Sequence, residues 1–192
     1  MSDFDKLIGV ACDITDRYDL DLVIANAGIS LGHNSGFSEF EGFKKLIDIN
    51  FTSIHALLTP IIPKMQQQKS GKIVLISSLA SIVAMPSSIA YSASKRALNS
   101  YAEGLRNLLA KDGIEVINIL PGFIQSEMTD KNEFKMPFFL SNEQGVKRVI
   151  YAIENSKKEY KFPRRFFMLI KFVSILPIIY KDKIIQLLHN KK

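Results

Sequence analysis

Three side chains in this sequence could together move a proton: Tyr91, Lys95 and Ser78. Tyr91 and Lys95 are four residues apart, so a helix would present both on the same face. A lysine ammonium beside a phenol favours the tyrosinate, which would bring proton exchange closer to neutral pH. Ser78 could hydrogen-bond the oxygen of a carbonyl or an alcohol. Together, the three residues predict the proton-transferring half of a hydride-transfer site.

The segments around these residues alternate between short apolar runs and longer helical patterns, as is typical of a parallel α/β sheet. We expect strands at Leu22–Ala25, Lys72–Ser77 and Glu115–Leu120. We expect helices from Glu39 or Phe40 to Gln68, from Tyr91 to Leu109, and from the N-cap Ser141 to about Asn155. Asn26, Ser78 and Pro121 each follow a predicted strand. Because open parallel sheets bind ligands beyond the carboxyl ends of their strands, these residues should meet at one site.

Five separated motifs resemble those of the short-chain dehydrogenase/reductase family. They are Asn26-Ala27-Gly28, Asp48-Ile49-Asn50, Ile76-Ser77-Ser78, Tyr91-Ser92-Ala93-Ser94-Lys95 and Leu120-Pro121-Gly122. The resemblance extends from about Asp13 to Ser126 and implies a Rossmann-like parallel sheet with flanking helices. It also implies an oxidoreductase that uses NAD or NADP to interconvert an alcohol and a carbonyl. The residue that would choose between NAD and NADP is missing from the sequence.

The resemblance implies a role for each residue of the predicted site. Tyr91 would be the general acid and base, and Lys95 would lower its pKa and hold the nicotinamide ribose. Ser78 would orient the substrate oxygen, and Asn50 would keep a water in the proton relay. Two structural alternatives stay open, since Ser78 could cap the following segment and Asn50 could satisfy helix backbone.

The resemblance also implies which residues contact the cofactor and the substrate. Asp13 would contact the adenine, and Asn26, Ala27 and Gly28 would pass its ribose. Pro121, Gly122, Ile124 and Ser126 would hold the carboxamide. Six apolar residues lie where relatives cover the substrate, and they favour a lipophilic one: Phe123, Met128, Phe134, Met136, Phe138 and Phe139.

The N-terminal part departs from the family pattern. Members of the family begin with a strand, a Gly-rich turn and a helix whose N-terminus receives the pyrophosphate, whereas here the first glycine is Gly9 and the next is Gly28. We therefore expect one truncated domain that starts near the third strand of the family, at Leu7–Ile14, with no helix between that strand and Leu22. The first strand of the remaining sheet would then have an exposed edge. We divide the chain into 1–20, a remnant of the third-strand region; 21–126, the catalytic core; 127–165, the substrate-covering segment and following helix; and 166–192, a basic and apolar tail.

This departure leaves three hypotheses about function. The first is an active oxidoreductase, and the second is an inactive remnant that binds a membrane or a partner. In the third, another polypeptide supplies the missing half.

The C-terminal tail is both basic and apolar. From Glu154 to Lys192 there are ten Lys/Arg and three Asp/Glu, a net charge of +7, against +6 for the whole chain. The apolar run Phe166–Tyr180 is shorter than the roughly 20 residues that span a bilayer. It could lie on an anionic lipid surface, or pack on the core or across a dimer. No known nucleic-acid-binding module is evident, and we expect no nucleic-acid partner.

Composition bounds the remaining possibilities. With 192 residues and 47% hydrophobic content, the chain is long enough and apolar enough for one folded domain. Its single cysteine, Cys12, suits a reducing compartment, and the acidic opening residues are unlike a secretory signal. We therefore expect a cytoplasmic protein, with peripheral contact at the inner membrane surface as the alternative.

The three histidines show no metal-binding spacing, and we predict no metal site. The helices at 40–68 and 91–109 are those through which relatives pair, which implies a homodimer.

Overall fold

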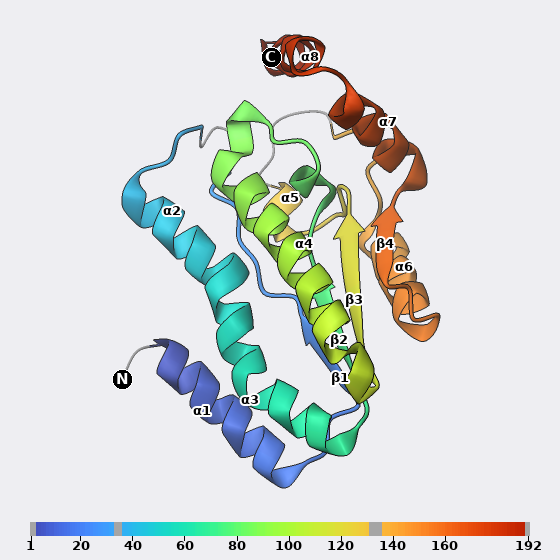
Figure 1. Ribbon diagram of the computed structural model, residues 1–192. Coiled ribbons are helices and arrows are strands. Elements are labelled where there is room, and N and C mark those ends of the chain that lie inside the picture. Colours follow the sequence, from blue (N-terminus) through green and yellow to red (C-terminus); the bar gives the residue numbers. More distant parts are fainter. Residues whose placement is uncertain (1–2, 33–35, 131–135, 191–192) are drawn as a thin grey trace.

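The computed structural model describes residues 3–32, 36–130 and 136–190. Its centre is a sheet of four parallel strands, shown in Figure 1. The strands are β1 (Leu22–Ala25), β2 (Gly71–Ile76), β3 (Ile114–Pro121) and β4 (Glu159–Phe162), in that spatial order. Because all neighbouring strands run parallel, their carboxyl ends lie along one edge, which we call the carboxyl edge. The predicted Rossmann-like parallel sheet with flanking helices is confirmed.

Helices cover both faces of the sheet. One face carries α3 (Ser53–Gln68) and α4 (Ile89–Leu109), and the other carries α6 (Asn142–Glu154). Because alternate residues of a strand point to opposite faces, Ile73 packs under α3 and α4 while Val74 packs toward α6. Burial on both faces explains why β2 and β3 read as largely continuous apolar runs.

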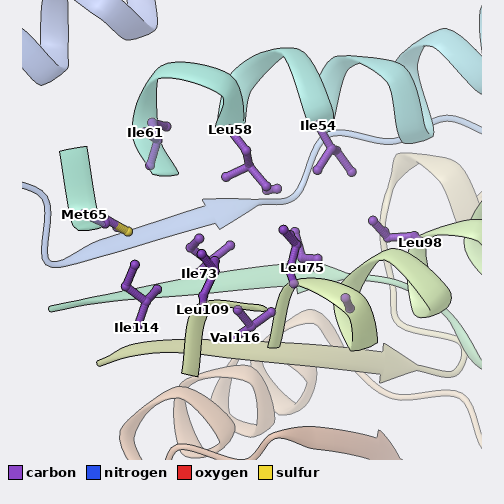
Figure 2. Close-up of a cluster of buried hydrophobic side chains, with 13 residues drawn as sticks. Ile54, Leu58, Ile61, Met65, Ile73, Leu75, Leu98, Leu109, Ile114 and Val116 are labelled. Carbon is purple, nitrogen blue, oxygen red and sulfur yellow. The ribbon is translucent and has the colours of Figure 1, made fainter. Parts of the chain in front are cut away.

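The larger core cluster lies between the sheet and the helices α3 and α4 (Figure 2). Leu58 and Met65 of α3 and Leu98 of α4 are almost completely buried there. Each such side chain contributes roughly 1.5–3 kcal/mol through its removal from water. By length and composition alone, Phe40–Gln68 could cross a membrane. Its residues Ile54, Leu58 and Ile61 instead pack against the sheet, as in the core helix of a globular domain.

The N-terminal segment is a helix, α1 (Asp3–Arg17), so the predicted strand at Leu7–Ile14 is wrong. A short apolar run fits a strand or a helix equally well, and the helical spacing of the buried Ala11 and Thr15 decides the outcome. This face packs against α3, beside which α1 lies in Figure 1. Asp13 is exposed on α1.

The long predicted helix at 40–68 consists of three pieces. They are α2 (Phe40–Ile47), a π-helical turn η1 (Asp48–Thr52) and α3. The predicted helix at 91–109 begins two residues earlier than expected, at Ile89. The predicted N-cap Ser141 is confirmed, and a reciprocal pair of hydrogen bonds with Gln144 makes it a capping box.

Two further features concern the ends of the sheet. Strand β4 was not predicted; it pairs with β3 and buries Phe162. At the other end, β1 pairs with β2 alone among the described strands, so the predicted exposed edge is confirmed. After β4 come α7 (Arg164–Ile175) and α8 (Ile178–Asn190). The remaining short helices are η2 (Leu79–Ser81), η3 (Pro86–Ser88), η4 (Ala110–Asp112) and α5 (Glu127–Asp130).

Candidate active site

Ser78 follows the carboxyl end of β2, where the extended chain turns into η2. Its Oγ accepts a hydrogen bond of 3.1 Å from the backbone N–H of Ala80, so Ser78 is the N-cap of η2. The same hydroxyl hydrogen-bonds the phenol of Tyr91. The capping role that the sequence left open is therefore real, and it fixes the hydroxyl in front of Tyr91.

Tyr91 lies in the first turn of α4, and its side chain is partly buried. This burial raises the pKa of Tyr91, while the hydrogen bond from Ser78 partly opposes the rise. The pKa of Tyr91 therefore lies above its ordinary value, opposite to the direction that we expected from Lys95. At neutral pH the phenol is protonated and able to donate its proton.

Lys95 lies one turn after Tyr91 and is only 3% exposed. Its Nζ donates a hydrogen bond of 2.8 Å to the carbonyl oxygen of Ile76 and lies 5.9 Å from the centre of the Tyr91 ring. Burial lowers the pKa of Lys95 to about 8, because a charged ammonium is disfavoured away from water. Ser77 ties this part of α4 to β2, since its Oγ donates to the carbonyl oxygen of Lys95 at 3.1 Å.

Asn50 is fully buried in the π-helical turn η1. Its Oδ1 accepts from the backbone N–H of Ile29 at 2.7 Å, and its Nδ2 donates to the carbonyl oxygen of Ile29 at 3.0 Å. The same Nδ2 donates to Ser94 Oγ at 3.1 Å. Asn50 therefore fastens the loop after β1 to α4, rather than satisfying the backbone of its own helix. Single π-turns inside helices are frequent at functional sites.

The loop after β1 places Gly28 against this cluster. A Cβ on Gly28 would lie 3.3 Å from Lys95 Nζ and 3.4 Å from Asn50 Oδ1, closer than most Cβ contacts. Asn26 and Ala27 are exposed just before it. Asp13 is not part of this group, because α1 leads into the start of β1, the end of the strand opposite the carboxyl edge. The prediction that Asp13 contacts the adenine rested on a strand assignment that α1 replaces.

The segment after β3 lies beside η2, since a Cβ built on Gly122 would lie 3.5 Å from Leu79. Gly122 donates its backbone N–H to the carbonyl oxygen of Phe162 at 2.7 Å, and Ile124 pairs with Leu140. Ser126 lies just before α5 and accepts a 3.3 Å hydrogen bond from the N–H of Thr129. Phe123 stacks on Phe166 of α7 with ring centres 5.7 Å apart.

The other predicted substrate-covering residues are only partly described. Phe138 stacks on Phe166 at the same centre-to-centre distance of 5.7 Å. Met128 and Met136 are half-buried, and Phe139 is exposed. Phe134 lies outside the described residues.

Two groups that support the site were missed by reasoning from the sequence. Ser94, between Tyr91 and Lys95, is fully buried, accepts from Asn50 and donates to the carbonyl oxygen of Tyr91 at 2.8 Å. Its place in the Tyr91–Lys95 motif was the available signal. The second group runs away from the site: Ser81 bonds the carbonyl oxygen of Ser78, and Asn99 bonds Ser81. Nothing in the sequence pattern marks this second group.

The position of the motifs at one edge of a parallel sheet agrees with a family-level match. A family model described as short chain dehydrogenase matches residues 2–136. The chain belongs to the short-chain dehydrogenase family.

Within this family, the chain is similar to an uncharacterized oxidoreductase of Myxococcus xanthus, with 36% identity over 158 residues. These residues cover 82% of this chain and 62% of that protein. It is also similar to the 3-oxoacyl-(acyl-carrier-protein) reductase FabG of Rickettsia prowazekii, with 37% identity over 118 residues, or 62% of this chain and 49% of that protein. The chain thus spans less than two thirds of the length of either relative.

A solved short chain dehydrogenase of Burkholderia cenocepacia J2315, in complex with NADP, has the same fold. The two structures superpose with a TM-score of 0.76 and 24% sequence identity. The match covers 88% of the present chain and 71% of the Burkholderia chain. At this level of identity, the likeness concerns the fold alone.

Proposed function

We propose that this chain carries the catalytic site of an NAD(P)(H)-dependent oxidoreductase that interconverts an alcohol and a carbonyl. One observation carries the proposal. The Tyr91 phenol is hydrogen-bonded to Ser78 beside the buried ammonium of Lys95, at the carboxyl edge of a parallel sheet. The family membership and the oxidoreductase relatives support the same reaction class.

The site fits the nicotinamide-ribose end of such a cofactor. An ammonium has three donors, and Ile76 accepts one of those of Lys95. Gly28 has no side chain, so the space beside Lys95 stays open; a Cβ at this position would narrow it. Lys95 would therefore hold the ribose hydroxyls in the space that Gly28 leaves, while Gly122, Ile124 and Ser126 would line the carboxamide.

The proposed chemistry divides among three side chains. The bound nicotinamide would exchange a hydride with the substrate carbon. Ser78 donates a hydrogen bond that holds the substrate oxygen next to Tyr91. In the reducing direction, Tyr91 gives its proton to that oxygen, and in the oxidising direction it takes the proton back. Lys95, held by Ile76, stabilises the tyrosinate that remains after the proton has left.

A competing function is supported by a different observation. The 192 residues contain no Gly-rich turn, and the edge of β1 is open, with Leu22 and Ile24 about two fifths exposed. An open strand edge can pair with another polypeptide. In this alternative the chain acts by binding a partner, and a partner strand completes the sheet.

Cofactor titration tests the proposal directly. The purified chain is titrated with NADPH and then with NADH, with nicotinamide fluorescence anisotropy as the observable. We expect saturable binding that is about tenfold or more weaker in Lys95→Ala, which corresponds to the loss of one or two hydrogen bonds to a charged group. Tyr91→Phe should bind the cofactor and lose turnover.

The matched control is Lys147→Ala, which removes an exposed lysine of α6 that is ion-paired with Glu143. This variant should bind like the native chain. Absence of binding by a chain that circular dichroism shows to be folded would overturn the oxidoreductase proposal and favour the partner-binding alternative.

We further propose that the substrate is lipophilic. The support is the stack in which Phe166 lies against both Phe123 and Phe138 at the carboxyl edge. Each methylene that an apolar wall removes from water contributes about 0.8 kcal/mol. The values of kcat/KM for matched short-chain and long-chain ketones should therefore differ in favour of the long chain, and equal values would contradict this preference.

We also propose a homodimer. A shallow apolar groove runs along the outer side of α4, and we call it the α4 groove; it is lined by Phe51, Ala97, Tyr101, Gly104 and Leu108, among others. Leu108 is more than half exposed. The groove lies on the two helices through which relatives were expected to pair.

A further inference from the structure

Helix α7 is apolar on both of its sides. Its inner side contributes Phe166, which stacks between Phe123 and Phe138, together with the half-buried Ile170. Its outer side presents other apolar residues at helical spacing, each more than half exposed: Met168, Leu169, Phe172 and Ile175. A helix that is hydrophobic all round is normally covered on every side. Something outside the described part of the chain should therefore cover the outer side of α7.

The exposed apolar surface continues into the first turn of α8. Ile178 and Ile179 are 66% and 76% exposed. With the four outer residues of α7 they form what we call the C-terminal apolar surface. Figure 1 shows α7 and α8 at the end of the molecule toward which the strands point. The surface thus lies at the same end as the carboxyl edge.

The charges around this surface are mainly positive, although Asp182 is also exposed in α8. Arg164 and Arg165 are exposed at the start of α7, Lys171 is exposed along it, and Lys183 is exposed in α8. Within the described residues these four make no ion pair, whereas Lys161 pairs with Glu159 at 2.6 Å. From residue 154 to residue 192 the net charge is +7. An apolar surface with unpaired cations around it complements a partner whose outer layer is anionic and whose interior is apolar.

These charges decide between the two obvious occupants. A second copy placed on the same surface would bring two segments of charge +7 together, which is electrostatically unfavourable. An anionic lipid surface meets both features at once. Helix α7 has 12 residues, about 18 Å, and ends before Pro177, so it is too short to span a bilayer and suits an in-plane position.

We propose that the C-terminal apolar surface docks onto the surface of an anionic lipid bilayer. Met168, Leu169, Phe172 and Ile175, with Ile178 and Ile179, enter the boundary between headgroups and acyl chains. The exposed arginines and lysines pair with the lipid phosphates and carboxylates. Docking in this orientation turns the carboxyl edge of the sheet toward the membrane. This inference does not depend on the proposed enzymatic activity.

Vesicle sedimentation with the full chain tests the docking. The probes are vesicles of phosphatidylcholine alone and vesicles that also contain about 30% phosphatidylserine, which gives the anionic surface potential on which basic segments depend. We expect binding to the anionic vesicles only, and we expect it to weaken as salt is added.

Two variants separate the apolar and the charged contributions. Arg164→Glu with Arg165→Glu should weaken binding about tenfold or more, because each basic residue near the surface contributes measurably to the attraction. Phe172→Asp with Ile175→Asp should weaken it by a similar factor through loss of apolar insertion. The matched control is Lys6→Glu with Lys147→Glu, which makes the same charge change at exposed lysines outside the surface. It should leave binding within about twofold of native, since distant charges are screened.

Three results would overturn the proposal. The first is failure of the folded native chain to bind anionic vesicles, and the second is binding that both surface variants leave unchanged. The third is a sedimentation-velocity result in which Phe172→Asp with Ile175→Asp dissociates an oligomer, because the surface would then be covered by a second copy. Circular dichroism of each variant separates lost docking from lost folding.

Discussion

At the scale of single residues, the site joins two groups whose pKa values burial moves in opposite directions. Burial raises the pKa of Tyr91 and lowers that of Lys95 to about 8. Each shift favours the neutral form of its group, so the phenol holds its proton until the substrate oxygen takes it. Asn50 and Ser94 keep the pair in place through hydrogen bonds that are shielded from solvent. Burial of the Lys95 ammonium also lowers the stability of the folded protein.

Lys95→Met should stabilise the protein at neutral pH. The pKa of Lys95 falls from 10.5 in the unfolded chain to about 8 in the folded one. Below pH 8 Lys95 is charged in both the folded and the unfolded state, and the folded state is destabilised by the buried ammonium. Between pH 8 and 10.5 the unfolded state binds more protons, so native stability rises with pH. At pH 7 we expect Lys95→Met to be more stable by about 1–3 kcal/mol, from 1.36 kcal/mol per pKa unit less the lost hydrogen bond to Ile76.

Urea unfolding at pH 7 and pH 10 measures this difference. The advantage of Lys95→Met should shrink at pH 10, and the exposed control Lys147→Met should show no pH-dependent difference. If the free energies of unfolding of Lys95→Met and of the native chain differ by the same amount at both pH values, the shifted pKa of Lys95 is contradicted.

At the scale of elements, the buried strands were predictable because burial on both faces leaves an unbroken apolar run. The ends of these runs in the sequence sufficed to place Ser78 and Pro121 at one edge. The segment Leu7–Ile14 was not predictable in this way, since eight mostly apolar residues fit either period. Strand β4 was missed because only Phe162 of its four residues is buried, so the segment carries little apolar signal. The π-turn around Asn50 depends on contacts with Ile29 and Ser94, which are distant in sequence.

The start of α6 offers a test at this scale. Ser141 Oγ accepts a 3.3 Å hydrogen bond from the N–H of Gln144, and Gln144 Oε1 accepts a 3.2 Å hydrogen bond from the N–H of Ser141. Ser141→Ala removes the first bond and leaves one N–H of the helix end unpaired. We expect the free energy of unfolding to fall by about 1 kcal/mol in urea titrations. Ser141→Asp keeps an acceptor at the N-cap and should restore most of the loss; equal losses in both variants would contradict the capping role.

At the scale of the whole molecule, three surfaces are left open on separate elements. They are the edge of β1, the α4 groove and the C-terminal apolar surface. Since they share no residue, a substitution on one leaves the others intact. Pairing of copies, pairing of strands and docking to lipid can therefore be distinguished from one another. The α4 groove permits the sharpest separation, because its lining includes a glycine.

Gly104→Trp should prevent pairing through the α4 groove without disturbing the fold. No atom outside the helix lies within 4 Å of a Cβ built on Gly104, so the indole of one copy has room within its own chain and occupies the place of the other. Gly9→Trp is the matched control: Gly9 is equally open, but it lies on α1, away from the groove. Light scattering after size exclusion should give a dimer for the native chain and for Gly9→Trp, and a monomer for Gly104→Trp. Both substitutions replace a helical glycine and should leave helix stability equal or higher by a few tenths of a kcal/mol. A native monomer, or a Gly104→Trp dimer, would mean that the groove is not the contact between copies, because two closely packed helices cannot accommodate a side chain of this size between them.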